Sequence, residues 1–162
     1  MKRRGFTLIE LLVVMAIMGI LTIITVSQFN TARIKARDSQ RKSDLSALSK
    51  ALLMYYADYN KFPDQIGNGT DSLTWGDGPF QDATGYVYMK ILPKDSVNNA
   101  TCPYVYLTND DRNKYALLGC LENVEDQDAK LTPSQTCNGK DGYNFGFISP
   151  NISFSDISGC SL

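Results

Sequence analysis

The feature that most constrains this chain is the apolar segment "FTLIELLVVMAIMGILTIITV" at residues 6–26, whose one charged residue is Glu10. As a helix this segment is roughly 31 Å long, enough to cross the hydrocarbon core of a bilayer. Lys2, Arg3 and Arg4 directly precede it. Basic residues stay on the cytoplasmic side of a membrane helix. The arrangement therefore predicts a single membrane-spanning helix with its N-terminus in the cytoplasm.

The helical pattern continues beyond this apolar segment. Residues 27–60 contain no glycine and no proline. Large apolar side chains recur there at intervals of three and four, which is typical of one helix face: Leu45, Leu48, Leu52, Tyr55 or Tyr56, and Tyr59. Pro63 cannot continue a helix. We expect one helix over about residues 6–60, with an apolar first half (6–26) and an amphipathic second half (27–62).

A basic stretch, "ARIKARDSQRK", lies between the two halves. One interpretation is a basic collar that contacts lipid headgroups, DNA or an acidic patch on a neighbour. The other is a solvated helix surface, which is favoured because Asp38 and Asp44 dilute the charge. The basic residues concerned are Arg33, Lys35, Arg37, Arg41 and Lys42.

Composition argues against an enzyme. The chain has no histidine, which excludes Ser-His-Asp and Cys-His nucleophile systems and imidazole zinc sites, and no motif suggests a cofactor. The net charge of -1 gives no indication of nucleic-acid binding. Cys102, Cys120, Cys137 and Cys160 lack C-x-x-C spacing and all lie beyond residue 100. They favour two disulfides in an oxidising compartment, which agrees with an extracytoplasmic head at residues 63–162.

Two segments read as a β-hairpin, "YVYLT" at residues 104–108 and "YALLGC" at 115–120, with a third strand at 143–149. A hairpin centred near Asp111 places Cys102 opposite Cys120, and Cys137 is then left to pair with Cys160. This is the pairing we expect among three connectivities.

An acidic run follows the second of these segments. Its carboxylates are hard oxygen ligands, but they lack the D-x-D-x-D-G spacing of a calcium loop. We therefore expect no metal, and the weak calcium candidates are Glu122, Glu125, Asp126 and Asp128.

The N-terminal segment "GFTLIELLVVMAIMGIL" resembles the signal of type IV prepilins and type II secretion pseudopilins. The resemblance implies that a prepilin peptidase removes the leader, residues 1–5, by cutting between Gly5 and Phe6, and then methylates the amino group of Phe6. It also implies that Glu10 faces the Phe6 amine of a neighbouring subunit when the helices pack in a filament. Pairing offsets the cost of placing both charges in a dry core.

Two further stretches, "SDLSALSKALLMYYADYNKFP" and "ILPKD", resemble the major pseudopilin of type II secretion. The resemblance implies an α+β pilin fold, with the long helix packed on a small antiparallel sheet. It implies a homopolymer built by an inner-membrane assembly platform and its ATPase: a type IV pilus for adhesion, twitching motility or DNA uptake, or alternatively a periplasmic pseudopilus. A membrane-tethered enzyme or binding domain is the third hypothesis.

Overall fold

The computed structural model describes one helix and seven short strands in the order α1, β1 to β7. It confirms the expected α+β fold. The chain divides into two compact units, Met1–Ala36 and Arg37–Leu162. The described residues are 5–64, 75–95, 97, 103–129, 135–137, 140–153 and 156–157.

Helix α1 spans Leu8–Tyr59 and includes 52 residues, so the single long helix predicted from the sequence is confirmed. It ends at Asn60, whose backbone has the left-handed φ of 52° that asparagine tolerates better than most residues. The Asn60 N–H donates to the Tyr56 carbonyl at 2.7 Å, which closes the last turn. Pro63 follows, so the chain cannot resume the helix directly.

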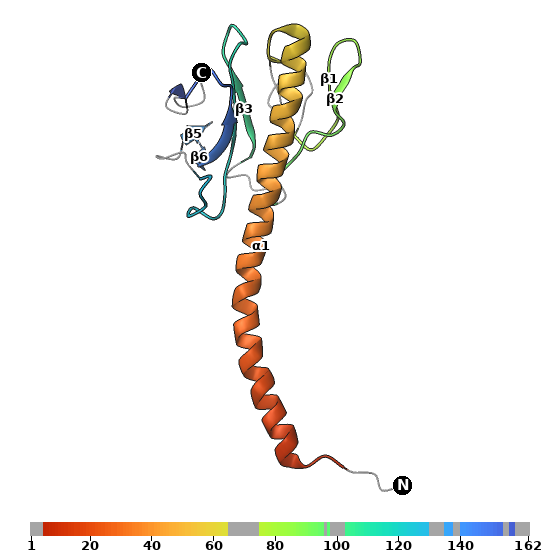
Figure 1. Ribbon diagram of the computed structural model, residues 1–162, viewed down its shortest axis with the longest axis vertical. Helices are drawn as coiled ribbons and strands as arrows, with labels where there is room; N and C mark the ends of the chain where they lie inside the picture. Colours follow the sequence, from red (N-terminus) through yellow and green to blue (C-terminus); the bar gives the residue numbers. More distant parts are fainter. Residues whose placement is uncertain are drawn as a thin grey trace. The chain divides into compact units, whose positions relative to one another are not determined.

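In the second unit, α1 lies between two β structures (Figure 1). On one side is a three-stranded antiparallel sheet in the order β3-β4-β7, formed by Val105–Thr108, Tyr115–Gly119 and Phe145–Ile148. On the other side is the hairpin of β1 (Phe80–Gln81) and β2 (Val87–Met89).

The central strand β4 is buried on both faces, which explains its nearly continuous apolar sequence. Leu117 points to the α1 side and shares a buried cluster with Leu48 and Leu52. Leu118 points to the opposite side and packs with Tyr143 and Ile157 in a second cluster. Successive side chains of a strand alternate between faces, so β4 joins the two clusters.

The two hairpin strands predicted from the sequence are confirmed as β3 and β4. Their register pairs Val105 with Leu118 and Thr108 with Tyr115, so the hairpin is centred between Asp111 and Arg112. This is half a residue later than predicted.

The third strand predicted at residues 143–149 is confirmed as β7, which pairs with β4, but it begins two residues later than predicted. Tyr143 belongs instead to β6 (Lys140–Tyr143), which pairs with β5 (Gln135–Cys137). Asn144 is the one residue between the end of β6 and the start of β7. Its buried side chain accepts from the Leu121 N–H at 2.7 Å and donates to the Leu121 carbonyl at 3.0 Å. These two bonds anchor the chain where it passes from one sheet to the other.

The hairpin β1–β2 was not predicted. Its turn is organised by Asp82, whose Oδ1 accepts from the Thr84 N–H, the Thr84 hydroxyl and the Tyr86 N–H at 2.6 to 2.9 Å. An aspartate that bonds backbone N–H groups ahead of it is a common turn former. Strand β1 has only two residues, so the alternation of apolar and polar residues that indicates a strand cannot be seen in its sequence.

The core on α1 leads to a stability prediction. Leu48 is fully buried against the sheet, whereas Leu53 is 46% exposed on the same helix. We expect Leu48→Ala to lower the free energy of unfolding by about 2–5 kcal/mol. Leu53→Ala, the matched control, should cost less than about 1 kcal/mol. Urea denaturation of the detergent-solubilised protein measures both, and equal losses would contradict this packing.

Candidate functional site

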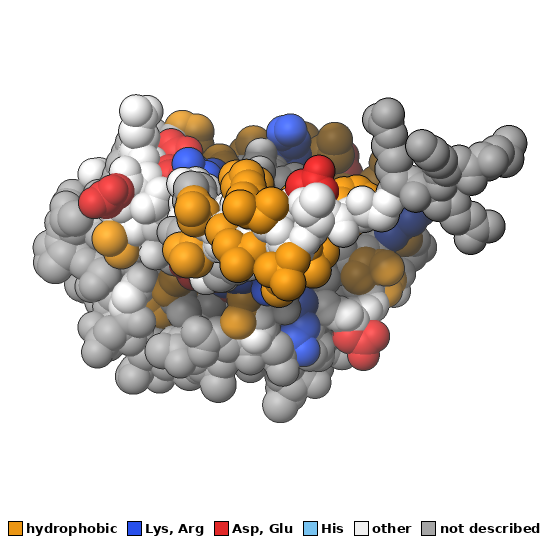
Figure 2. Space-filling model, turned by 90° about the horizontal axis from the view of Figure 1, so that it is seen from below, with side chains coloured by type: hydrophobic (Ala, Val, Ile, Leu, Met, Phe, Trp, Pro, Cys, Tyr) orange, Lys and Arg blue, Asp and Glu red, His pale blue; other side chains and the backbone are white. Residues whose placement is uncertain are grey.

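The first unit exposes a continuous apolar surface. Phe6 is 87% exposed and Ile23 76%, and the apolar side chains between them are also exposed. The helix contains an 18-residue window of mean hydropathy 2.6, so it is long and apolar enough to cross a membrane. Hydrophobic side chains gather together on the face drawn in Figure 2. Exposed apolar surface on this scale marks a membrane or protein interaction site.

The single carboxylate of this segment helps to begin the helix. Glu10 Oε2 accepts hydrogen bonds from the Thr7 N–H and the Thr7 hydroxyl, each at 2.8 Å. In return, the Glu10 N–H donates to the Thr7 hydroxyl oxygen at 3.3 Å. This reciprocal pair is a capping box, which satisfies N–H groups that the first helical turn leaves unpaired. This role of Thr7 was not predicted, although the T-x-x-E spacing in "TLIE" signals it.

The residues predicted at the cleavage site precede α1. Gly5 and Phe6 are both exposed and lie outside the helix. A methyl group placed on Gly5 would meet nothing within 4 Å. The peptide bond between them is therefore accessible, and its cleavage stays a prediction.

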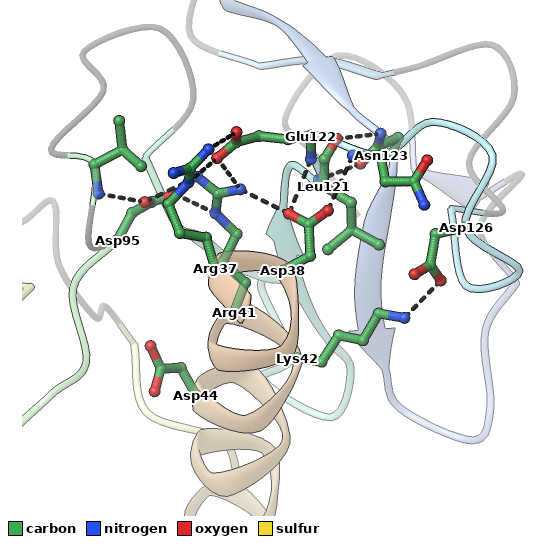
Figure 3. A network of polar contacts seen from close by, with 12 residues as sticks. Arg37, Asp38, Arg41, Lys42, Asp44, Asp95, Leu121, Glu122, Asn123 and Asp126 are labelled. Carbon is green, nitrogen blue, oxygen red and sulfur yellow. Dashed lines mark hydrogen bonds and ion pairs between the residues drawn. The ribbon is translucent and has the colours of Figure 1, made fainter. Parts of the chain in front are cut away.

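A buried ion-pair network lies at the start of the second unit (Figure 3). Its centre is Arg41, whose side chain is 5% exposed. The guanidinium contacts Asp38 at 2.8 Å, Asp95 at 2.9 Å and Glu122 at 2.8 Å. Asp95 follows β2, and Glu122 lies just after β4. Arg41 thus connects α1 to two segments that are distant in sequence.

Asp38 adds backbone contacts to this network. Its carboxylate accepts from the Glu122 N–H at 3.0 Å and the Asn123 N–H at 2.9 Å (Figure 3). Arg37 forms two further hydrogen bonds with the Glu122 carboxylate. A buried carboxylate with both backbone and guanidinium donors has most of its hydrogen-bonding capacity satisfied, which limits the cost of burying it.

Lys42 extends the contacts to the acidic run. Its ammonium lies 2.5 Å from an oxygen of Asp126 and 2.8 Å from one of Asp128. Because Glu122 is held by Arg37 and Arg41, three of the four calcium candidates contact cations of α1. Glu125 has no ion pair among the described residues. Within those residues, no group of three or more metal-ligating side chains is found.

Both interpretations of the basic stretch were therefore wrong for Arg41, which is neither a solvated residue nor available to an outside partner. Arg37 and Lys42 also bind carboxylates of their own chain. Local charge could not reveal these ion pairs, because most of the partner carboxylates lie far along the chain. Arg33 and Lys35 remain exposed.

The predicted disulfide pairing stays a prediction. Cys120 directly follows β4 and is disulfide-bonded. Cys137 is the last residue of β5. Cys102 and Cys160 lie outside the described residues.

The fold and the N-terminal motif define a class of protein in which an exposed apolar helix segment precedes a small α+β head. Residues 1–26 match the family model of the prokaryotic N-terminal methylation motif. The chain is 34% identical to type II secretion system core protein G of Escherichia coli, over 72% of this chain and 80% of that protein. It is 33% identical to core protein G of Pseudomonas aeruginosa, over 81% of this chain and 96% of that protein.

A type IV major pilin protein, PilA of Myxococcus xanthus, is 38% identical over 41% of this chain and 31% of its own length. No solved structure matches the chain significantly. The chain belongs to the family of type IV pilins and type II secretion pseudopilins.

The network leads to a prediction on Arg41. We expect Arg41→Ala to lower the free energy of unfolding by about 3–5 kcal/mol, because Asp38 and Asp95 would remain buried without a cation. Lys35→Ala removes an exposed cation of the same helix and should change stability by less than about 0.5 kcal/mol. Chemical denaturation compares the two variants, and an Arg41→Ala protein as stable as the Lys35 control would contradict the network.

A second prediction concerns pH. The hydrogen bond from Arg37 lowers the pKa of Glu122, and the hydrogen bond from Lys42 lowers that of Asp126. A carboxyl group whose pKa is lower in the folded state stabilises the fold above its unfolded pKa, and this contribution is lost as pH falls through the folded value. Stability should therefore be steady from pH 7 to 5 and fall below about pH 4.5.

Denaturation curves measured across this range for the parent and two variants test the assignment. Glu122→Gln and Arg37→Gln each remove one partner, so each should lose stability at neutral pH and show a weaker decline in acid. A decline in both variants as steep as that of the parent would contradict the assignment.

Proposed function

We propose that this chain is a structural subunit that polymerises through α1 into a type IV pilus-type filament. The observation that carries the proposal is the exposed apolar surface of the first unit, interrupted by one carboxylate. Before assembly a bilayer covers this surface, and in a filament the same surface of other copies covers it. The proposed role is mechanical and involves no catalysis.

The precursor is held in the inner membrane with its N-terminus in the cytoplasm and its head outside. A prepilin peptidase cuts between Gly5 and Phe6 and methylates Phe6. An assembly platform and its ATPase then move the subunit from the bilayer into the growing filament. The match of residues 1–26 to the methylation motif supports the processing step.

Glu10 fits a role in aligning neighbouring helices. One of its oxygens, Oε2, holds the capping box with Thr7. In the part of the chain that the structure describes, no hydrogen bond to the other oxygen is found. That oxygen can accept from the methylated Phe6 amine of a neighbour, so one carboxylate both caps its own helix and sets the axial register of the next.

Two machines fit this subunit. A type IV pilus would serve adhesion, twitching motility or DNA uptake, and a type II secretion pseudopilus would act in protein export. The pseudopilus is favoured by the extent of similarity, because core protein G of Pseudomonas aeruginosa aligns over 96% of its length. The pilus is favoured by the four cysteines, because the predicted pairing of Cys137 with Cys160 would close a C-terminal loop of the kind common in type IV pilins.

Variants of Glu10 separate its two roles. Glu10→Ala removes both the cap and the charge, and Glu10→Gln keeps an oxygen for the cap but loses the charge. We expect membrane insertion and cleavage to continue in both, and both to lose filament incorporation. Normal assembly of Glu10→Gln beside defective Glu10→Ala would mean that only the cap matters, and normal assembly of both would remove the register argument.

Electron microscopy of filaments sheared from producing cells, with mass spectrometry of the subunit N-terminus, tests the function itself. Long fibres that begin with methylated Phe6 would identify a pilus subunit. A cleaved chain that forms only short envelope structures would identify a pseudopilin. An uncleaved chain without fibres would contradict the proposal.

A further inference from the structure

One face of α1 in the first unit carries an exposed aromatic ring and a cation, which lie beyond the apolar surface of residues 6–23. Phe29 is 56% exposed, and the Arg33 guanidinium lies 4.5 Å from the centre of its ring. Positions four apart share one helix face, so the two side chains form one unit. Among the described residues, no carboxylate forms an ion pair with Arg33. We call this pair the Phe29–Arg33 face.

The second unit carries a surface of complementary composition, formed where the end of α1 meets the β1–β2 hairpin. The Tyr59 hydroxyl donates to Asp82 at 2.8 Å, and the Tyr88 hydroxyl donates to Asp58 at 2.7 Å. Tyr86 is 63% exposed, and its ring centre lies 5.0 Å from that of Tyr88. We call these five residues the tyrosine–aspartate patch.

The patch carries negative charge that no cation of the described residues pairs with. The Thr84 hydroxyl and other donors lower the pKa of Asp82 to about 2, so this carboxylate is ionised at neutral pH. The Tyr88 hydroxyl also lies 3.4 Å from Asp82, which brings the two aspartates near the same hydroxyl. Tyrosine hydroxyls donate hydrogen bonds but bring no positive charge. Within the described residues, neither Asp58 nor Asp82 forms an ion pair.

We propose that the tyrosine–aspartate patch of one copy receives the Phe29–Arg33 face of a second copy. A guanidinium can stack on a tyrosine ring while its N–H groups bind carboxylate oxygens, and Phe29 can pack against the exposed ring of Tyr86. Arg33 and Asp58 of one chain are too far apart on α1 to meet, because a helix rises about 1.5 Å per residue. The contact therefore joins two chains, and it rests on the proposed filament.

Charge reversal tests this contact in the full chain. Arg33→Glu should lower the yield of sedimentable filaments about tenfold or more, because it places like charges together. Lys35→Glu is the matched control. It makes the same charge change two positions along, which is about 200° around the helix, and it should leave the yield within about twofold of the parent.

A reciprocal exchange gives a sharper result. Asp58 is exposed, and its side chain hydrogen-bonds only the Tyr88 hydroxyl among the described residues. Asp58→Arg alone should lower filament yield, and combination with Arg33→Glu should restore much of it because the charges are then exchanged. If the double variant is as defective as the sum of the two single variants, the pairing is overturned.

A photo-crosslinking amino acid placed at Tyr86 in assembled filaments identifies the occupant directly. The expected product is a dimer joined within residues 28–36 of the second copy, as located by peptide mass spectrometry. Intact filaments in which Tyr86 joins another segment, or another protein, would overturn this contact and leave the proposed function standing. A parent chain that forms no filaments of any length would overturn both.

Discussion

The head depends on one buried cation. Arg41 lies on α1 and holds carboxylates from two other segments, Asp95 after β2 and Glu122 after β4. Asp38, one turn away on the same helix face, binds the guanidinium and two backbone N–H groups beyond β4. Burial of Leu48 and Leu52 stabilises the head, but the hydrophobic effect is not directional and does not by itself fix the orientation of the β structures. The charged bonds have strict geometry, so they fix where both β structures attach to the helix.

The two units of the chain differ in how many of their charged and apolar side chains find partners within the chain. In the second unit, the helix cations Arg37, Arg41 and Lys42 pair within the chain, and many of the large apolar residues form two buried clusters. In the first unit, the apolar residues from Phe6 to Ile23 have no such cover. A chain with a packed second unit and an exposed apolar first unit is suited to polymerisation. Assembly can cover the exposed apolar side chains without reorganising the head.

Features that depend on residues close together in the sequence could be predicted, and features that depend on distant residues could not. The spacing of Leu45, Leu48 and Leu52 indicates a helix because that signal is local, and the roles that the family resemblance implies for Gly5, Phe6 and Glu10 stay predictions. The role of Arg41 was missed because its partners Asp95 and Glu122 lie far away in sequence. The strand break at Asn144 was missed for the same reason, since it depends on a side-chain contact with Leu121. The capping role of Thr7 is local and was available in "TLIE".

The capping box gives the carboxylate of Glu10 a role within its own apolar helix. If Glu10 served only a neighbour, it would be an unpaired group in every subunit still in the membrane. Its bonds to Thr7 satisfy one oxygen within its own chain and hold the other at the helix end. In the proposed filament, assembly would add a second partner to a carboxylate that is already in place, and no existing bond would have to break. Such preorganisation lowers the entropy cost of docking one subunit on the next.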